Sequence, residues 1–338
     1  MGRKATLARV LSATGLLPVL GTMRRWSGVL CLNYHRIGDG DRSPFDRELW
    51  SAGAADFDEQ VRYLTSHFRV VTPDDLPEVC LTPHDRYVLI TFDDGYRDNY
   101  ELALPILKRH GAAATFFVTT GVVDHPRPTW WDEIAWMVRT SRRTLVEAGR
   151  WLNGPVMFDE PDRARAVEAL VSRYKTLPAN ATEAYLEAMA AATGTGRGSQ
   201  GLADGTWMTW DMIRELRAAG MVVGGHSVNH PVLANLAPDD QWREIAGCAR
   251  RLEDELGEPM RYFSYPVGQP TSFNGQTRAC LDRLGVRMAF SYYGGHRRFE
   301  DWDRLDVRRI AIERYMDAAW VRATLALPGI FGAEKDVD

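Results

Sequence analysis

Two adjacent aspartates end an apolar stretch and are the first candidates for chemistry. The stretch VLITFDDGYRDN, Val88 to Asn99, runs apolar for five residues before it reaches Asp93 and Asp94. The pair fits a turn, because Asp-Gly favours tight turns and aspartate caps helices. It also fits a site, since two carboxylates held this close are stabilised by a cation or by a shifted pKa. The choice between turn and site depends on the residues that lie near the pair.

Histidines follow two other apolar stretches of the chain. His35 comes directly after one of them, and the segment HSVNH places His226 and His230 after another. Pro231 disfavours helical geometry at His230, so we expect this pair on the loop that leaves a strand. A lone buried histidine is more often a hydrogen-bonded core residue than a ligand. Two imidazoles and one carboxylate around an open position, however, form the ligand set of a catalytic divalent metal, most often zinc.

The elements that must position these residues are short apolar strands that alternate with amphipathic helical segments. The expected strands are Val29–Tyr34, Tyr87–Phe92, Ala114–Val118, Met221–Gly225, Tyr262–Tyr265, Val286–Ser291 and Arg309–Ile312. Alternation of strand and helix predicts a parallel sheet, open or closed into a barrel. The carboxyl ends of parallel strands share one face, which would bring the aspartates and histidines together.

One long segment interrupts this alternation. Residues 125–205 show helical patterns and no convincing strand, and they end in the glycine-rich GTGRGSQGLADG. We therefore divide the chain into an N-terminal amphipathic segment (1–28), a first barrel part (29–124), a helical insertion (125–205) and a second barrel part (206–330). The insertion leaves a strand at its active-site end, which makes it a candidate lid. Its tryptophans are expected mainly in the core, with Trp131 as a candidate substrate contact.

Composition and charge narrow the class of protein. The 338 residues are 45% hydrophobic with a net charge of -4, which is typical of a large globular core and gives no electrostatic footprint for nucleic acid. The four cysteines have no metal-binding spacing and favour a reducing, cytoplasmic location. Basic and apolar residues mix in the first 26 residues, which predicts a helix that either packs on the protein or lies on an anionic membrane surface.

Three motifs together resemble one known family. TFDDG, HSVNH and FSYPVG are similar to the first three motifs of the polysaccharide deacetylases, the NodB-homology or carbohydrate esterase 4 family. This resemblance implies a distorted (β/α)7-type barrel with a helical insertion. By position, it also implies that Asp93 is the general base and that Asp94, His226 and His230 bind one divalent metal ion, for which we expect zinc.

Two departures from the family pattern point to one subgroup. Many members carry an arginine in the third motif that orients the base, whereas this chain has Ser264 there, and Arg261 lies three residues too early. The usual C-terminal Leu-x-His motif is also missing. The stretch CLNYHRIGD, however, resembles the N-terminal strand of the circularly permuted poly-N-acetylglucosamine deacetylases, in which the acid histidine comes first. The resemblance therefore assigns the general-acid role to His35, with His296 as the next residue to test.

The implied reaction is metal-dependent hydrolysis of an N-acetyl group on a sugar. The backbone N–H of Val267 would hold the developing oxyanion, and Tyr265 and Trp131 would contact the substrate. Expected substrates are a polysaccharide, an oligosaccharide or a lipid-linked saccharide, with peripheral membrane contact through the N-terminal segment. One alternative is deformylation, or another amide hydrolysis, of a lipid-linked amino sugar. An alternative of another class is an inactive carbohydrate-binding relative.

Overall fold

Seven parallel strands form the centre of the molecule. The computed structural model describes residues 3–23, 26–79, 85–158, 160, 163–296 and 302–332, so Cys80 lies outside the described residues. The barrel strands are β1 (Gly28–Tyr34), β5 (Arg86–Phe92), β6 (Thr115–Val118), β9 (Val222–Gly225), β10 (Tyr262–Ser264), β11 (Met288–Ser291) and β12 (Val307–Ala311). Every strand expected from the sequence is confirmed, with ends that differ by at most two residues.

The strands close into a barrel because the first strand pairs on both sides. The order β1-β12-β11-β10-β9-β6-β5 returns to β1, which pairs with β5 along its whole length. The short β4 (Arg69–Val70) pairs with the beginning of β5 from outside the ring. All these pairings are parallel, so the expected (β/α)7-type barrel is confirmed.

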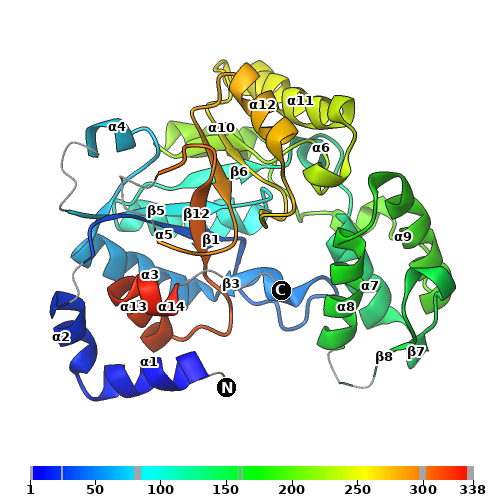
Figure 1. Ribbon diagram of the computed structural model, residues 1–338, viewed down its shortest axis with the longest axis horizontal. Helices are drawn as coiled ribbons and strands as arrows, with labels where there is room; N and C mark the ends of the chain where they lie inside the picture. The colour runs from blue at the N-terminus through cyan, green and yellow to red at the C-terminus, as the bar shows by residue number, and fades with distance from the viewer. Residues whose placement is uncertain are drawn as a thin grey trace.

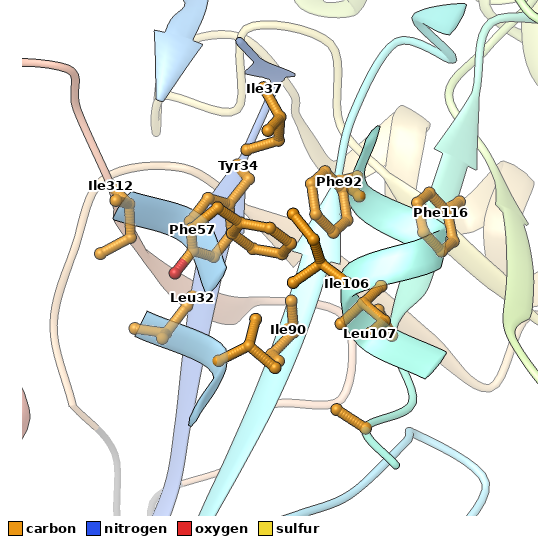
Figure 2. Close-up of a cluster of buried hydrophobic side chains, with 14 of the residues drawn as sticks. Leu32, Tyr34, Ile37, Phe57, Ile90, Phe92, Ile106, Leu107, Phe116 and Ile312 are labelled. Atoms are coloured by element: carbon orange, nitrogen blue, oxygen red, sulfur yellow. The ribbon is translucent and has the colours of Figure 1, made fainter. Parts of the chain in front are cut away.

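Alternate residues of the strands face the two sides of the barrel wall. Leu32 and Tyr34 of β1 and Ile90 and Phe92 of β5 pack outward against the surrounding helices, as Figure 2 shows. Residues of the opposite parity form an apolar cluster with side chains of the other strands: Val29, Cys31, Tyr87, Leu89, Phe117, Tyr262, Phe290 and Val307. Burial on both faces explains why these strands are apolar runs without alternation.

Helices surround the barrel (Figure 1). They are α3 (Ala54–His67), α4 (Leu76–Val79), α5 (Leu104–Arg109), α6 (Thr120–Asp124), α10 (Trp210–Ala218), α11 (Pro238–Leu256), α12 (Gly275–Arg283), α13 (Ala318–Ala326) and α14 (Pro328–Phe331). A π-helical segment, Asn99–Ala103, precedes α5, and a two-strand pair, β2 (Arg36–Ile37) with β3 (Trp50–Ala52), follows β1. Short 3-10 turns complete the connections, among them Arg47–Leu49.

The segment between β6 and β9 contains its own helices and its own apolar cluster. Helices α7 (Trp130–Thr140), α8 (Ala164–Lys175) and α9 (Ala179–Thr193) lie to one side of the barrel in Figure 1. The expectation of a segment without strands was wrong, because β7 (Leu145–Val146) pairs with β8 (Val156–Met157) as a short hairpin. Two-residue strands leave no alternation long enough to recognise in the sequence. The division of the chain at 125 and 205 remains a prediction.

The N-terminal segment forms two helices. α1 (Arg3–Ala13) and α2 (Leu16–Met23) meet at Gly15, whose φ is +68°, and both contact α13. A φ in this region is inexpensive for glycine, which explains why the helical pattern breaks there. Within the described ranges, each helix is too short or too polar to cross a bilayer.

Candidate active site

The carboxyl ends of three barrel strands bring the predicted residues into one cavity. Asp93 and Asp94 follow β5, His226 and His230 follow β9, and His35 follows β1. All five line a single cavity of about 610 Å³. The sequence-based expectation that these residues converge is therefore met by the structure.

Asp94, His226 and His230 form the one group in the described residues with the geometry of a metal site. Their candidate ligand atoms all lie within 4.8 Å of one another, and all three side chains are buried. The Nε2 atoms of His226 and His230 lie 3.3 Å and 3.5 Å from Asp94 Oδ1. His230 follows a turn and not a helix, since Ser227 and His230 have φ values of +64° and +56°.

The surroundings of this group fit a divalent cation. Nδ1 of His226 lies 2.8 Å from the carbonyl oxygen of Ser264, which can only accept, so Nδ1 donates and Nε2 faces Asp94. Burial and the neighbouring His226 lower the pKa of His230 to about 3, which keeps that imidazole neutral. Asp94 Oδ1 is buried and accepts no hydrogen bond from any residue that the structure describes. A cation between these atoms would satisfy them.

Asp93 has a different environment from its neighbour. Arg309 donates from both terminal nitrogens to the two carboxylate oxygens, each at 2.8 Å. Asn33 Nδ2 and Ser264 Oγ donate to Oδ2 at 3.3 Å and 3.2 Å. Burial alone would raise the pKa of Asp93, but the Arg309 guanidinium, together with the neighbouring His226, outweighs burial and holds that pKa well below its usual range. Asp93 is thus an ionised, oriented carboxylate and Asp94 is the one turned to the imidazoles.

Arg309 supplies the arginine that the third motif lacks, and reasoning from the sequence missed it. It comes from β12, is completely buried, and donates to the Ser291 carbonyl oxygen at 3.0 Å and to Asn33 Oδ1 at 2.9 Å. Its Nη2 also donates to Ser264 Oγ at 2.8 Å, so the serine in the motif position is bonded to the replacement arginine. Arg261 instead pairs with Asp74 at 2.7 Å and is not among the residues that line the cavity.

His35 lies on the rim of the same cavity with its backbone fixed. Its N–H donates to Ser51 Oγ at 3.0 Å, and its carbonyl oxygen accepts from Asn99 Nδ2 at 2.7 Å. The imidazole meets the ring of Tyr292 edge-on, with 5.5 Å between centroids. His296 packs against Trp26 at 5.0 Å and does not line this cavity. The general-acid role of His35 remains a prediction.

Backbone strain is concentrated around the cavity. Five described residues other than glycine have positive φ, and four of them are at the site: Asp94, Ser227, His230 and Val267. This conformation is costly for a β-branched residue such as Val267, whose φ is +64°. Such backbone strain persists only where the surrounding structure holds the backbone in place. Val267 lines the cavity, and its role as an oxyanion donor remains a prediction.

The two aromatic residues predicted to contact substrate are largely buried. Tyr265 stacks on Phe273 with 3.9 Å between centroids, and its hydroxyl donates to the Leu305 carbonyl oxygen at 2.9 Å. Trp131 meets the His230 ring edge-on at 4.4 Å and donates from Nε1 to the Tyr96 hydroxyl at 3.0 Å. Both touch the cavity wall, but their contacts are those of residues that hold the site in shape. Direct substrate contact by either remains a prediction.

Helix α8 forms one wall of the cavity that Asp94, His226 and His230 also line. Seven of its residues line the cavity: Ala164, Arg165, Val167, Glu168, Val171, Ser172 and Lys175. Two hydrogen bonds join the inserted segment to the barrel. Asn235 Nδ2 donates to the carbonyl oxygen of Leu177, just after α8, at 2.8 Å. Trp130 Nε1, at the start of α7, donates to the carbonyl oxygen of His230 at 3.1 Å. The segment therefore forms a wall of the cavity in this structure, and its role as a lid remains a prediction.

Comparison with known proteins agrees with this geometry. A family model described as polysaccharide deacetylase matches residues 81–144 and 156–289. The Bacillus subtilis protein YxkH, whose name places it with the polysaccharide deacetylases, is 33% identical over 262 residues. That alignment covers 76% of this chain and 62% of YxkH. The chain belongs to the polysaccharide deacetylase family.

Solved structures of deacetylases share the fold. The Streptococcus pyogenes deacetylase PplD, solved in complex with acetate, has a TM-score of 0.55 at 19% identity and covers 86% of this chain and 95% of its own. IcaB from Ammonifex degensii has a TM-score of 0.55 at 22% identity and covers 89% of this chain and 97% of its own. At these identities the likeness establishes the barrel fold of the deacetylases.

The family match includes some of the site and omits the rest. Asp93, Asp94, His226 and His230 fall inside the matched residues, whereas His35 and Arg309 fall outside them. His35 follows β1 and Arg309 lies in β12, and these two strands are neighbours in the closed barrel. Closure of the barrel therefore brings both residues to the four that the family model covers.

Proposed function

We propose that the protein is a metal-dependent hydrolase that removes the N-acetyl group from an N-acetylated sugar. The observation that carries this proposal is the division of labour between two adjacent buried aspartates. Asp93 is held by Arg309 as an ionised carboxylate, while Asp94 faces two imidazoles with an unsatisfied oxygen. A base beside a cation site, on one cavity floor, is what amide hydrolysis requires.

Asp94, His226 and His230 would hold the metal, and zinc suits a set of two imidazoles and one carboxylate. A divalent cation there supplies Lewis-acid polarisation of the acetamide carbonyl and lowers the pKa of water. The Ser264 carbonyl oxygen fixes the orientation of the His226 ring, and the Trp131 ring limits rotation of His230. These contacts pre-orient the ligands before the cation binds.

The chain's own groups move the protons. Asp93 removes a proton from the attacking water as the new carbon–oxygen bond forms at the acetamide carbon. The backbone N–H of Val267 donates to the carbonyl oxygen, which carries the developing negative charge. His35 then donates a proton to the sugar nitrogen as the carbon–nitrogen bond breaks, so that acetate and a free amino sugar leave.

The cavity favours a saccharide over a small amide. Its volume of about 610 Å³ is far larger than an acetamide group needs. Helix α8 adds polar residues to the cavity lining. A polysaccharide, an oligosaccharide or the sugar of a lipid-linked saccharide would occupy this space. The N-acetyl group would lie at the floor and neighbouring sugars along α8.

Release of acetate from a panel of N-acetylated substrates tests this function. The purified protein should release acetate and a matching amine from at least one acetylated oligosaccharide or lipid-linked sugar, as measured by mass spectrometry. An N-formylated sugar in the same panel identifies a deformylase, because formate would then replace acetate. A protein that binds these sugars without releasing either acid is the inactive carbohydrate-binding relative, and the proposal fails.

Metal analysis provides the second test. We expect about one equivalent of divalent metal per chain, which the double change His226→Ala with His230→Ala removes together with activity. His67→Ala is the matched control, because that histidine lies exposed at the end of α3, away from the cavity. Unchanged metal content in the double variant contradicts the ligand assignment.

A further inference from the structure

The two N-terminal helices are fixed to the body of the protein on one side. Ala8 of α1 and Leu17 of α2 are buried in a cluster with Ala323, Leu327 and Phe331 of the C-terminal helices. Arg9 pairs with Asp317 at 2.5 Å, at the N-cap of α13. Figure 1 shows α1 and α2 beside α13 and α14, at the edge of the molecule. Their outer side is therefore a defined surface.

Several large apolar residues of these helices are exposed. We call this set the docking face and define it as Leu7, Val10, Leu16, Val19, Met23 and, from the adjacent α14, Ile330. The side chains of these residues are between 41% and 78% exposed, and they make up six of the ten large hydrophobic residues found exposed in the described chain. The positions 16, 19 and 23 recur at helical spacing, so they form a stripe on α2. Clustered exposed apolar residues mark a surface that binds something.

Charge indicates what the docking face binds. The described residues 3–23 include three basic residues, Arg3, Lys4 and Arg9, and no acidic one, whereas the whole chain has a net charge of -4. Arg3 and Lys4 are exposed at the start of α1. An apolar stripe beside concentrated positive charge complements an anionic bilayer surface, which accepts the apolar side chains and attracts the cations. The 8 residues of α2 span only about 12 Å, so this helix can lie in the interface but cannot cross it.

A second cavity lies between the N-terminal helix α1 and the catalytic cavity, and it shares lining residues with the catalytic cavity. It has a volume of about 200 Å³ and extends from Lys4 of α1, Trp320 of α13 and Phe331 of α14 to three residues that also line the catalytic cavity: Tyr292, Glu313 and Tyr315. Tyr315, which lines both cavities, is 55% exposed. The catalytic cavity therefore has a neighbouring hollow that α1 helps to line.

We propose that the docking face binds an anionic membrane surface and thereby presents the catalytic cavity to saccharides anchored in that membrane. Membrane binding is independent of the chemistry at the metal site. The choice of a lipid-anchored saccharide rests on the proposed deacetylase function. The two parts are therefore tested separately.

Vesicle sedimentation tests the binding. The wild-type protein should sediment with vesicles of phosphatidylcholine mixed with phosphatidylglycerol, and more weakly with phosphatidylcholine alone or at high salt. The double change Leu7→Glu with Leu16→Glu should weaken this binding on the order of tenfold or more, because it removes two apolar contacts and adds repulsion. Leu16 is the first residue of α2, where a glutamate is favourable to the helix.

A matched control uses the same substitutions elsewhere. Leu102 and Leu145 are 37% and 36% exposed and lie outside the docking face, so Leu102→Glu with Leu145→Glu should sediment like the wild type. Equal loss in both double variants means that charge alone decides binding, which contradicts a defined docking face. The same holds if the wild type does not sediment with anionic vesicles. A wild-type dimer in solution that Leu7→Glu with Leu16→Glu dissociates would assign the face to a second copy of the chain instead.

Activity distinguishes the two parts of the proposal. The Leu7→Glu with Leu16→Glu variant should hydrolyse a soluble acetylated chito-oligosaccharide at the wild-type rate. It should hydrolyse an N-acetylglucosaminyl lipid carried in anionic vesicles more slowly than the wild type does. Equal rates of both proteins on the vesicle substrate contradict the presentation of anchored sugars. Absence of wild-type hydrolysis on every substrate contradicts the proposed function and leaves the sedimentation result standing.

Discussion

The floor and the α8 wall of the catalytic cavity are built in different ways. On the floor, Asp93 and Arg309 are both buried, and each is held by hydrogen bonds from several strands. On the wall, Arg165, Glu168, Ser172 and Lys175 are exposed and recur along one face of a single helix. The floor allows each group one position, whereas the wall presents long side chains that can rearrange.

This difference separates the chemistry from the choice of substrate. A proton-transfer group must be held close to one geometry, which the buried network on the floor provides. A site for a chain of sugars needs several polar contacts that adapt to the ligand, which the exposed stripe on α8 can supply. Changes on the floor should therefore lower kcat for every substrate, and changes on the wall should alter KM for long substrates alone.

Asp93→Asn should have the largest effect. The amide cannot take a proton from water, so kcat should fall by about 10²–10⁴, the usual contribution of a general base. Metal content should be unchanged, because Asp94 and the imidazoles carry the ligand atoms. Steady-state kinetics and metal analysis on the same preparation check both statements. Loss of the metal would mean that the roles of the two aspartates are reversed.

His35→Ala should have the next largest effect. A general acid must carry a proton when the amine leaves, so the alkaline limb of the wild-type kcat profile should depend on this residue. The variant should have a lower kcat and a flattened alkaline limb, with metal content unchanged. A near-normal kcat with the alkaline limb in place would transfer the acid role to another group.

Arg309→Met should shift the acid limb of the profile. Without the guanidinium, burial dominates and raises the pKa of Asp93, so the base becomes protonated at higher pH. The acid limb of kcat/KM should move upward by about 1–3 pH units. Removing the partner of a buried charge also destabilises the fold, by about 3–5 kcal/mol.

Arg309→Lys keeps the protein testable if the methionine variant does not fold. The lysine retains a positive charge but not the two parallel bonds to the carboxylate, so a smaller shift in the same direction is expected. An acid limb that stays in place in a folded Arg309 variant would show that another group sets the ionisation of Asp93.

Changes on the α8 wall should have the smallest effect. Glu168→Ala or Lys175→Ala should raise KM for a long substrate several-fold, on the order of one lost hydrogen bond, and leave kcat for a short one unchanged. Kinetics on short and long acetylated oligosaccharides measure the contrast. Thr182→Ala on α9 is the control, because Thr182 does not line the cavity. Equal effects on both substrates would mean that these α8 residues act by holding the residues of the cavity floor in position.

The barrel could be predicted because its strands are short apolar runs that end at polar residues. Each run is buried on both faces, so its pattern is local and does not depend on distant residues. The β7–β8 hairpin was missed because two residues per strand cannot show a pattern. The break between α1 and α2 depends on the single residue Gly15.

The site could be predicted only where its residues follow a strand end. Asp93, Asp94, His226 and His230 stand out because all four lie within five residues of the end of an apolar run. Arg309 lies within a strand, in the sequence VRRIA, where an arginine resembles a solvent-facing residue. Only closure of the barrel turns it inward, toward an aspartate 216 residues away in the chain. A contact of this kind has no local pattern in the sequence.

Barrel closure through β1 also constrains the order in which the protein can fold. Asn33 of the first strand bonds to Arg309 of the last, across 276 positions of the chain. Contacts this far apart slow folding, and a ribosome releases β12 after nearly all of the other strands. Until β12 is added, Asp93 has no positive partner in the barrel interior, so an ionised Asp93 opposes closure of the incomplete ring. The nascent barrel should therefore stay open and gain its catalytic base and its final stability in one late step.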